Sequence, residues 1–119
     1  MSYSEKIKEV IGGSEVALFM KGTPAFVMCG NSDRALQALR RAGAPVTAVD
    51  VLPDPAIRQE LSAISGWPTI PQVFVKGELV GGADIVEELE ANGELEQTLR
   101  AKLGEDYAAS RDETTVALT

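Results

Sequence analysis

The feature that most constrains the fold is a continuous apolar run, Val16–Met20, bounded on both sides by turn-forming residues. A run of this length without polar alternation is typical of a strand that is buried on both faces of a sheet. Such a strand lies inside a sheet that helices cover on both sides. The run therefore predicts an α/β domain, and the rest of the chain has to supply the helices and the neighbouring strands.

The periodicity of apolar residues predicts helices and strands in alternation around this run. The expected elements, in chain order, are a helix over 4–11, the strand 16–20, a helix over 32–42, a strand over 46–51, a helix that starts at 54–55 and includes Ile57, Leu61 and Ile64, a hairpin of strands 73–75 and 78–80, and helices around 85–89 and 95–103. The strand–helix–strand unit gives a parallel pair, and the hairpin adds an antiparallel pair. We predict a four-stranded mixed sheet flanked by helices on both faces.

The 119 residues are enough for one domain, and the periodicity ends at residue 104, where the composition becomes polar and acidic. We therefore expect a domain over 1–103 and a mobile acidic tail over 104–119. The net charge is −7, but residues 1–80 carry eight acids and eight bases. The acidic total argues against nucleic-acid binding, while the neutral first part leaves basic residues available to an anionic ligand.

Other sequence properties bear on the compartment. No apolar run approaches the roughly 20 residues that span a bilayer, so we expect no membrane partner. The first residues lack the apolar core of a signal peptide, and a single cysteine provides no disulfide framework. A reducing compartment is the default for such a chain. We expect a cytoplasmic protein; an organellar matrix reached after removal of a presequence stays open as the alternative.

Cys29 lies where a loop meets the start of a helix, in the segment Cys29-Gly30-Asn31-Ser32. The free N–H groups and the dipole of a helix N-terminus favour the thiolate, and Lys21 adds a positive charge. The chain has no histidine, which excludes a cysteine-protease dyad and removes the commonest zinc ligand. Thiol exchange or sharing of a soft metal remains. Ser32 stands where a dithiol oxidoreductase carries its second cysteine, and a hydroxyl cannot resolve a mixed disulfide.

Two further segments are candidates for ligand binding. A cis Ile70–Pro71 bond would explain a proline directly before a central strand and would free the preceding backbone to pair with an extended ligand. Gly81–Asp84 opens a helix, where glycines permit close approach and free N–H groups suit a carboxylate. Asp84 either caps this helix or accepts a hydrogen bond from a ligand ammonium. A plain turn is the alternative at both segments, and the five glutamates within 87–96 are typical of a solvated helix face.

Taken together, these segments resemble the monothiol glutaredoxins. The matching segments, in the same order and spacing over about residues 3–103, are Lys21-Gly22-Thr23-Pro24, Cys29-Gly30-x-Ser32, Trp67-Pro68-Thr69-Ile70-Pro71-Gln72, Lys76-Gly77 and Gly81-Gly82-x-Asp84. The resemblance implies a thioredoxin fold and glutathione as the ligand. It implies that Cys29 meets the glutathione sulfur and that Thr69 and Pro71 pair with the peptide backbone. The remaining implied contacts are Lys21 and Arg58 with the glycine carboxylate, and Gly82, Ala83 and Asp84 with the γ-glutamyl end.

The resemblance also implies a [2Fe–2S] cluster with Cys29 as its metal ligand. An all-thiolate cluster of this type needs four sulfurs, which two chains and two glutathione molecules supply. We therefore expect a monomer without the cluster and a homodimer with it, acting in iron–sulfur cluster assembly and redox homeostasis, with iron–sulfur recipient proteins as partners. Two alternatives stay open. One is a one-cysteine oxidoreductase, at most a weak enzyme, that removes glutathione from protein thiols; the other is a glutathione-binding regulator without a stable cluster.

Three positions depart from the family's pattern. Asn31 replaces the usual phenylalanine, Ser62 stands where relatives often carry a lysine, and Val27 replaces a frequent proline. At Asn31 an apolar cover beside the sulfur becomes a polar amide, which puts the shielding and lifetime of a cluster in question. Ser62 removes one possible contact to glutathione, and Val27 loosens the loop before the cysteine.

Overall fold

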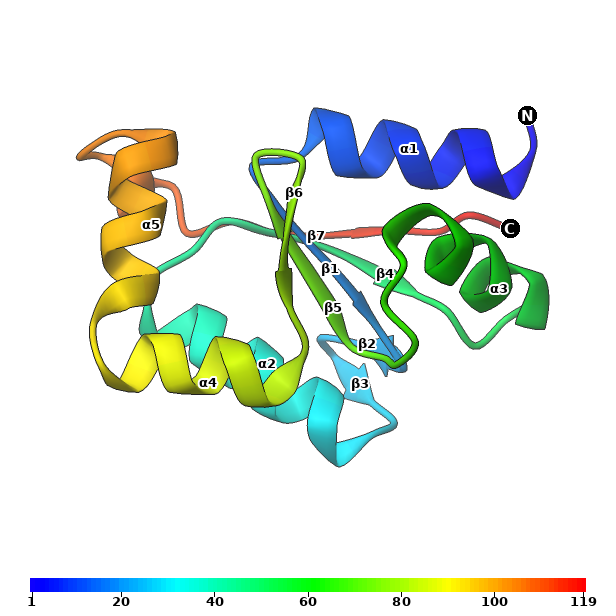
Figure 1. Cartoon of the computed structure of the whole chain (residues 1–119), viewed down its shortest axis with the longest axis horizontal. Coiled ribbons are helices and arrows are strands. Elements are labelled where there is room, and N and C mark those ends of the chain that lie inside the picture. The colour runs from blue at the N-terminus through cyan, green and yellow to red at the C-terminus, as the bar shows by residue number, and fades with distance from the viewer.

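The computed structural model describes all 119 residues and has a central sheet with helices on both faces (Figure 1). The elements are α1 (Tyr3–Gly13), β1 (Val16–Met20), β2 (Gly22–Thr23), β3 (Phe26–Val27), α2 (Gly30–Arg41), β4 (Val46–Asp50), α3 (Pro55–Ser65), β5 (Gln72–Val75), β6 (Glu78–Gly81), α4 (Ala83–Ala91), α5 (Glu94–Leu103), the 3-10 helix η1 (Tyr107–Ala109) and β7 (Glu113–Val116). The strands are ordered β6-β5-β1-β4-β7. No helix of the chain is both long and apolar enough to cross a membrane.

The strand β1 is the centre of the sheet, and all five of its side chains are fully buried. Leu18 and Met20 point into a core that α2, α4 and α5 cover. Ala17 and Phe19 point to the opposite face, into a second core that contains residues of α1 and α3. Figure 1 shows these two helix layers on either side of the strands. The prediction of a strand buried on both faces is confirmed.

The strand directions bring three chain segments to one edge of the sheet. The strand β1 is parallel to β4 and antiparallel to β5, and β5 is antiparallel to β6. The end of β1, the start of β5 and the end of β6 therefore lie at the same edge. The helix α2 begins shortly after β1, and α4 begins directly after β6, so the N-termini of both helices also face this edge.

The turn and cap chemistry agrees with the sequence predictions. The hairpin between β5 and β6 turns at Lys76 and Gly77, which both have positive φ, as a two-residue hairpin turn requires. Asp54 caps α3 by accepting a 2.9 Å hydrogen bond from the backbone N–H of Ala56, and Pro55 occupies the first helical position. The Ile70–Pro71 peptide bond is cis, as expected.

The segment 104–119 corrects the sequence prediction, because it is not a mobile tail. Its strand β7 pairs in parallel with β4, which makes the sheet five-stranded rather than four-stranded. Tyr107 is buried and donates a 2.8 Å hydrogen bond to the carbonyl of Ala42, and Leu118 is buried in the second core. Lys6 donates a 2.7 Å hydrogen bond to the Leu118 carbonyl. Three of the four β7 side chains are exposed, so backbone pairing at the sheet edge tolerates a polar composition.

Candidate functional site

Cys29 is the N-cap residue of α2 at the edge where β1, β5 and β6 meet. Its side chain is half-buried, its backbone is extended, and its carbonyl accepts a 3.0 Å hydrogen bond from the N–H of Asp33. The backbone N–H of Ser32 contributes most to lowering the pKa of the thiol, and the N–H of Asn31, the Ser32 hydroxyl and the charge of Lys21 act in the same direction. Burial opposes them. The thiol therefore lies at the N-terminus of α2, where the helix start favours the thiolate, as the sequence predicts.

Ser32 connects the end of β1 to the first turn of α2. Its side chain is fully buried, and its hydroxyl oxygen accepts a 3.0 Å hydrogen bond from the backbone N–H of Lys21. Because that bond uses a lone pair, the hydroxyl proton stays available for the sulfur of Cys29. The serine thus favours the thiolate and also connects the first turn of α2 to the end of β1.

The loop before Cys29 contains the short paired strands β2 and β3. Gly22 has a φ of 92°, and a Cβ there would clash with the carbonyl of Phe26 and lie 2.7 Å from the N atom of Met28. Asp50, at the end of β4, accepts 2.9 Å hydrogen bonds from the backbone N–H groups of Gly22 and Leu52. Only glycine fits at position 22, where the backbone has positive φ and lies close to Phe26 and Met28. The hydrogen bond to Asp50 connects this part of the loop to the sheet and so positions the chain that leads to Cys29.

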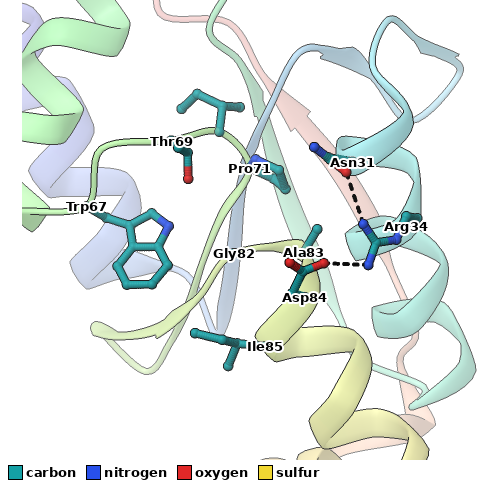
Figure 2. A pocket seen from close by; sticks show the side chains of 10 residues that line it. Asn31, Arg34, Trp67, Thr69, Pro71, Gly82, Ala83, Asp84 and Ile85 are labelled. Carbon is teal, nitrogen blue, oxygen red and sulfur yellow. Dashed lines mark hydrogen bonds and ion pairs between the residues drawn. The ribbon is translucent and has the colours of Figure 1, made fainter.

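A pocket of about 500 Å³ opens beside the first turn of α2 (Figure 2). It is lined by residues from α2, from the loop before β5 and from the start of α4: Asn31, Arg34, Trp67, Thr69, Ile70, Pro71, Gly82, Ala83, Asp84 and Ile85. Five of the eight predicted glutathione-binding residues are among them, namely Thr69, Pro71, Gly82, Ala83 and Asp84. The topology thus brings together two segments that are separated by ten residues, 72–81, in the sequence.

The loop before β5 presents free backbone groups to this pocket. The buried amide of Gln72 donates hydrogen bonds of 3.0 and 3.1 Å to the carbonyls of Trp67 and Thr69, which fixes the loop. The N–H and carbonyl of Ile70 make no hydrogen bond within the chain. An extended ligand can therefore pair with Ile70 as a strand would. The sequence predicts that the residue before the proline, Ile70, pairs with an extended ligand, and the resemblance adds its neighbours Thr69 and Pro71.

Gly82 and Trp67 pack tightly at the base of the pocket. A Cβ on Gly82 would lie 3.2 Å from the indole nitrogen of Trp67 and 3.3 Å from the carbonyl oxygen of Pro71. The indole nitrogen is buried and has no hydrogen-bond partner. Gly82 is also the N-cap residue of α4, and no side chain caps this helix. The first N–H groups of α4 are therefore available to a ligand anion.

Arg34 is a pocket residue that sequence reasoning missed. Figure 2 shows it between Asn31 and Asp84. Its Nη2 lies 2.7 Å from Oδ1 of Asp84 and 2.8 Å from Oε1 of Glu87, and its Nη1 donates a 3.0 Å hydrogen bond to Oδ1 of Asn31. Asp84 therefore does not cap α4. The acidic face of α4 is also more than a solvated surface, because Glu87 and Glu90 form ion pairs with arginines of α2.

The other three predicted residues, Cys29, Lys21 and Arg58, do not line the pocket. Cys29 precedes Asn31 by two residues, so its thiol lies at the same helix start. Lys21 directly follows β1 and is half-buried, whereas Arg58 is exposed on α3. Neither cation takes part in an ion pair, since the six ion pairs of the chain involve other residues.

Comparison with known proteins identifies similar chains. A family model described as glutaredoxin matches residues 16–80. Glutaredoxin 4 of Pasteurella multocida is 47% identical over 107 residues, which are 90% of this chain and 97% of that protein. Monothiol glutaredoxin-S11 of rice is 48% identical over 98 residues, 82% of this chain, and the match spans only 20% of the rice protein.

Solved structures agree with the sheet and helix arrangement described above. A monomeric truncated mutant of Trypanosoma brucei 1-C-Grx1 has a TM-score of 0.77 and 39% identity, and the match covers 86% of this chain and 93% of that chain. The expected thioredoxin fold is thereby confirmed, with β7 as an additional strand.

Proposed function

The chain belongs to the glutaredoxin family, and we propose that it is a glutathione-dependent monothiol glutaredoxin that binds and transfers a [2Fe–2S] cluster as a glutathione-bridged homodimer. The observation that carries the proposal is the position of Cys29. This single thiol, with its lowered pKa, begins the same helix whose first turn lines the pocket. A ligand that forms a disulfide with Cys29 needs a thiol of its own. To pair with the free backbone groups of Ile70 in the pocket, it also needs an extended backbone.

Glutathione has the chemistry that this site requires. Its cysteine backbone pairs with the free groups of Ile70, between Thr69 and Pro71. Its γ-glutamyl end lies at Gly82, Ala83 and Asp84, where the uncapped N-terminus of α4 offers N–H groups. Lys21 and Arg58, which take part in no ion pair within the chain, are assigned to its glycine carboxylate.

The thiol of Cys29 supports exchange chemistry with glutathione. Its thiolate attacks the glutathione sulfur of a glutathionylated substrate, the S–S bond between glutathione and substrate breaks, and the substrate leaves as a thiolate that takes up a proton. Cys29 then carries the glutathione as a mixed disulfide. Ser32 cannot resolve the mixed disulfide. The thiolate of a second glutathione therefore attacks the glutathione sulfur, the bond to Cys29 breaks, and glutathione disulfide and the Cys29 thiolate are released. The lowered pKa favours this activity, and protein deglutathionylation is the second candidate function.

The donor atoms of the chain fit a shared cluster. No group of three or more His, Cys, Asp or Glu side chains is placed to hold a metal ion. Cys29 is the single thiol, so an all-thiolate [2Fe–2S] cargo takes one sulfur from each of two chains and the other two from glutathione. We further propose the cytoplasm as the compartment, because a thiol without an intrachain partner depends on a reducing environment.

Anaerobic reconstitution with iron, sulfide and glutathione tests the proposal. We expect a coloured species that elutes at the size of two chains, while the untreated protein elutes as one chain. Omission of glutathione and the Cys29→Ser variant are the controls, and both should stay colourless. A colourless wild type, or colour that persists in either control, contradicts cluster binding. Turnover of a glutathione mixed disulfide by such a colourless wild type supports the oxidoreductase, and ligand binding without turnover supports the regulator.

A further inference from the structure

We propose that Arg34 is a specificity-determining residue: with Asn31 it binds the carboxylate of an α-amino acid head group whose ammonium binds Asp84. All three residues line the pocket, and Figure 2 shows them on its α2 and α4 side. This assignment rests on the proposed function, because the ligand is taken to be a γ-glutamyl peptide. The ligand carboxylate thus has binding groups on α2, in addition to the free N–H groups at the N-terminus of α4.

The hydrogen-bond inventory leaves donors free at this corner of the pocket. A guanidinium has five N–H groups, and four of those on Arg34 bind Glu87, Asp84 and Asn31. One N–H on Nη1 is left. The amide nitrogen of Asn31 makes no hydrogen bond, although the amide oxygen is held by Arg34. A carboxylate oxygen can therefore accept from Arg34 and Asn31 together.

Asp84 supplies the complementary acceptor. Its Oδ1 binds Arg34, whereas its Oδ2 accepts no hydrogen bond within the chain, and its side chain is 89% exposed. A ligand ammonium can reach Oδ2 without breaking the ion pair. The corner thus presents two donors and one acceptor, which is the pattern that a zwitterionic amino-acid head requires.

The charges around Arg34 make this residue important for binding the ligand carboxylate. Glu87 holds the guanidinium through two hydrogen bonds of 2.8 and 3.3 Å, so its orientation is fixed before a ligand arrives. With Arg34 present, Arg34, Asp84 and Glu87 sum to one negative charge. Without it, two carboxylates face the incoming ligand carboxylate and repel it. The loss of Arg34 is therefore expected to penalise the carboxylate of the ligand more than its ammonium.

Another arginine provides a matched control. Arg41 also lies on α2 and pairs with Glu90 of α4 at 2.6 Å, but neither residue lines the pocket. Arg41→Gln removes an ion pair between the same two helices and leaves the ligand site intact. Arg34→Gln removes both the ion pair and the proposed ligand contact, and Arg34→Lys retains only the charge.

The test measures the equilibrium constant for a mixed disulfide on Cys29 by mass spectrometry. Three symmetric disulfides serve as probes: glutathione disulfide, an analogue with a 4-aminobutyryl group that lacks the α-carboxylate, and an analogue with a glutaryl group that lacks the ammonium. In the wild type we expect each analogue to form the mixed disulfide about tenfold less favourably than glutathione, as for the loss of a charge-assisted hydrogen bond. Each preference is a ratio within one protein, so differences in protein concentration do not affect it, whereas an unfolded variant would lose both preferences.

We expect Arg34→Gln to bring the preference over the carboxylate-free analogue close to one while it retains a preference over the ammonium-free analogue. Arg34→Lys should give an intermediate ratio, and Arg41→Gln the wild-type ratios. The proposed role of Arg34 is wrong if Arg34→Gln keeps the wild-type preference for the carboxylate, or if Arg41→Gln loses this preference to the same extent. Neither result would contradict the proposed function. A wild type that forms no mixed disulfide with glutathione overturns the proposed function and this assignment with it.

Discussion

The hydroxyl of Ser32 accepts a 3.0 Å hydrogen bond from the backbone N–H of Lys21, and both residues lower the pKa of the Cys29 thiol. One buried side chain thus accepts from the first backbone donor after β1 and also helps to lower the pKa of the thiol. Ser32 therefore has two measurable roles, one in the acidity of the thiol and one in stability.

Ser32→Ala is expected to raise the pKa of Cys29. In the wild type, hydrogen bonds to the thiolate lower this pKa, so the thiolate fraction and the alkylation rate rise at a lower pH than for a free cysteine, whose pKa is about 8.5. The variant should shift the alkylation curve to higher pH, and it leaves the Lys21 N–H unpaired at a cost of about 1–3 kcal/mol in unfolding free energy. Ser110→Ala, at an exposed serine, is the control. An unchanged curve would mean that the Ser32 hydroxyl does not contact the sulfur.

The C-terminal segment is expected to contribute to stability. Tyr107→Phe loses a buried hydrogen bond to Ala42 and should lower the unfolding free energy by about 1 kcal/mol. Leu118→Ala leaves a gap in the second core and should lower it by about 2 kcal/mol. Urea unfolding measures both, and Thr115→Ala, exposed on β7, should stay within about 0.5 kcal/mol of the wild type. If both variants matched this control, the docked position of residues 104–119 would be wrong.

Gly82→Ala is expected to disturb the pocket without backbone strain. The φ of Gly82 is −96°, which alanine adopts, but the added Cβ lies 3.2 Å from the Trp67 indole nitrogen. Because Trp67 is the single tryptophan, its fluorescence should shift in the variant, and glutathione binding to Cys29 should weaken several-fold. Gly13→Ala adds a Cβ in open space and should change neither quantity. Wild-type fluorescence and binding in Gly82→Ala would contradict the packing described here.

Asn31→Phe is expected to lengthen the lifetime of a bound cluster several-fold. The exposed amide of Asn31 follows Cys29 by two residues, and an apolar ring there would exclude water from the sulfur. The decay of visible absorbance in air measures the lifetime. Asn31→Ala removes the amide without adding an apolar cover, so it should not prolong the lifetime. An equal lifetime in wild type and Asn31→Phe would show that shielding at this position is unimportant.

The sequence predicts the central fold because burial leaves a clear pattern there. Val16–Met20 is buried on both faces and reads as an uninterrupted apolar run, and the hairpin turn needs Gly77 at positive φ. The strand β7 was missed because it lies at the edge of the sheet. Its side chains mostly face solvent, and its stability comes from backbone pairing with β4, which no side-chain pattern reports.

The candidate site was predictable where glycine, proline and cysteine impose local geometry, as at Gly82, Pro71 and Cys29. The Arg34–Asp84 ion pair was not, because it joins two helices across 50 positions of the chain. A charged residue on a helix has many possible partners, and the sequence does not rank them. Only the packing of α2 against α4 selects Asp84 and Glu87 as partners of Arg34.

A crystal structure of the protein with glutathione in a mixed disulfide on Cys29 would show whether the pocket receives the glutathione that Cys29 carries. We expect the peptide backbone to pair with Ile70 and the γ-glutamyl group to lie at Gly82 and Asp84. A glutathionyl group that instead lies against the exposed side chains of Phe26 and Met28, with the pocket empty, would contradict the account.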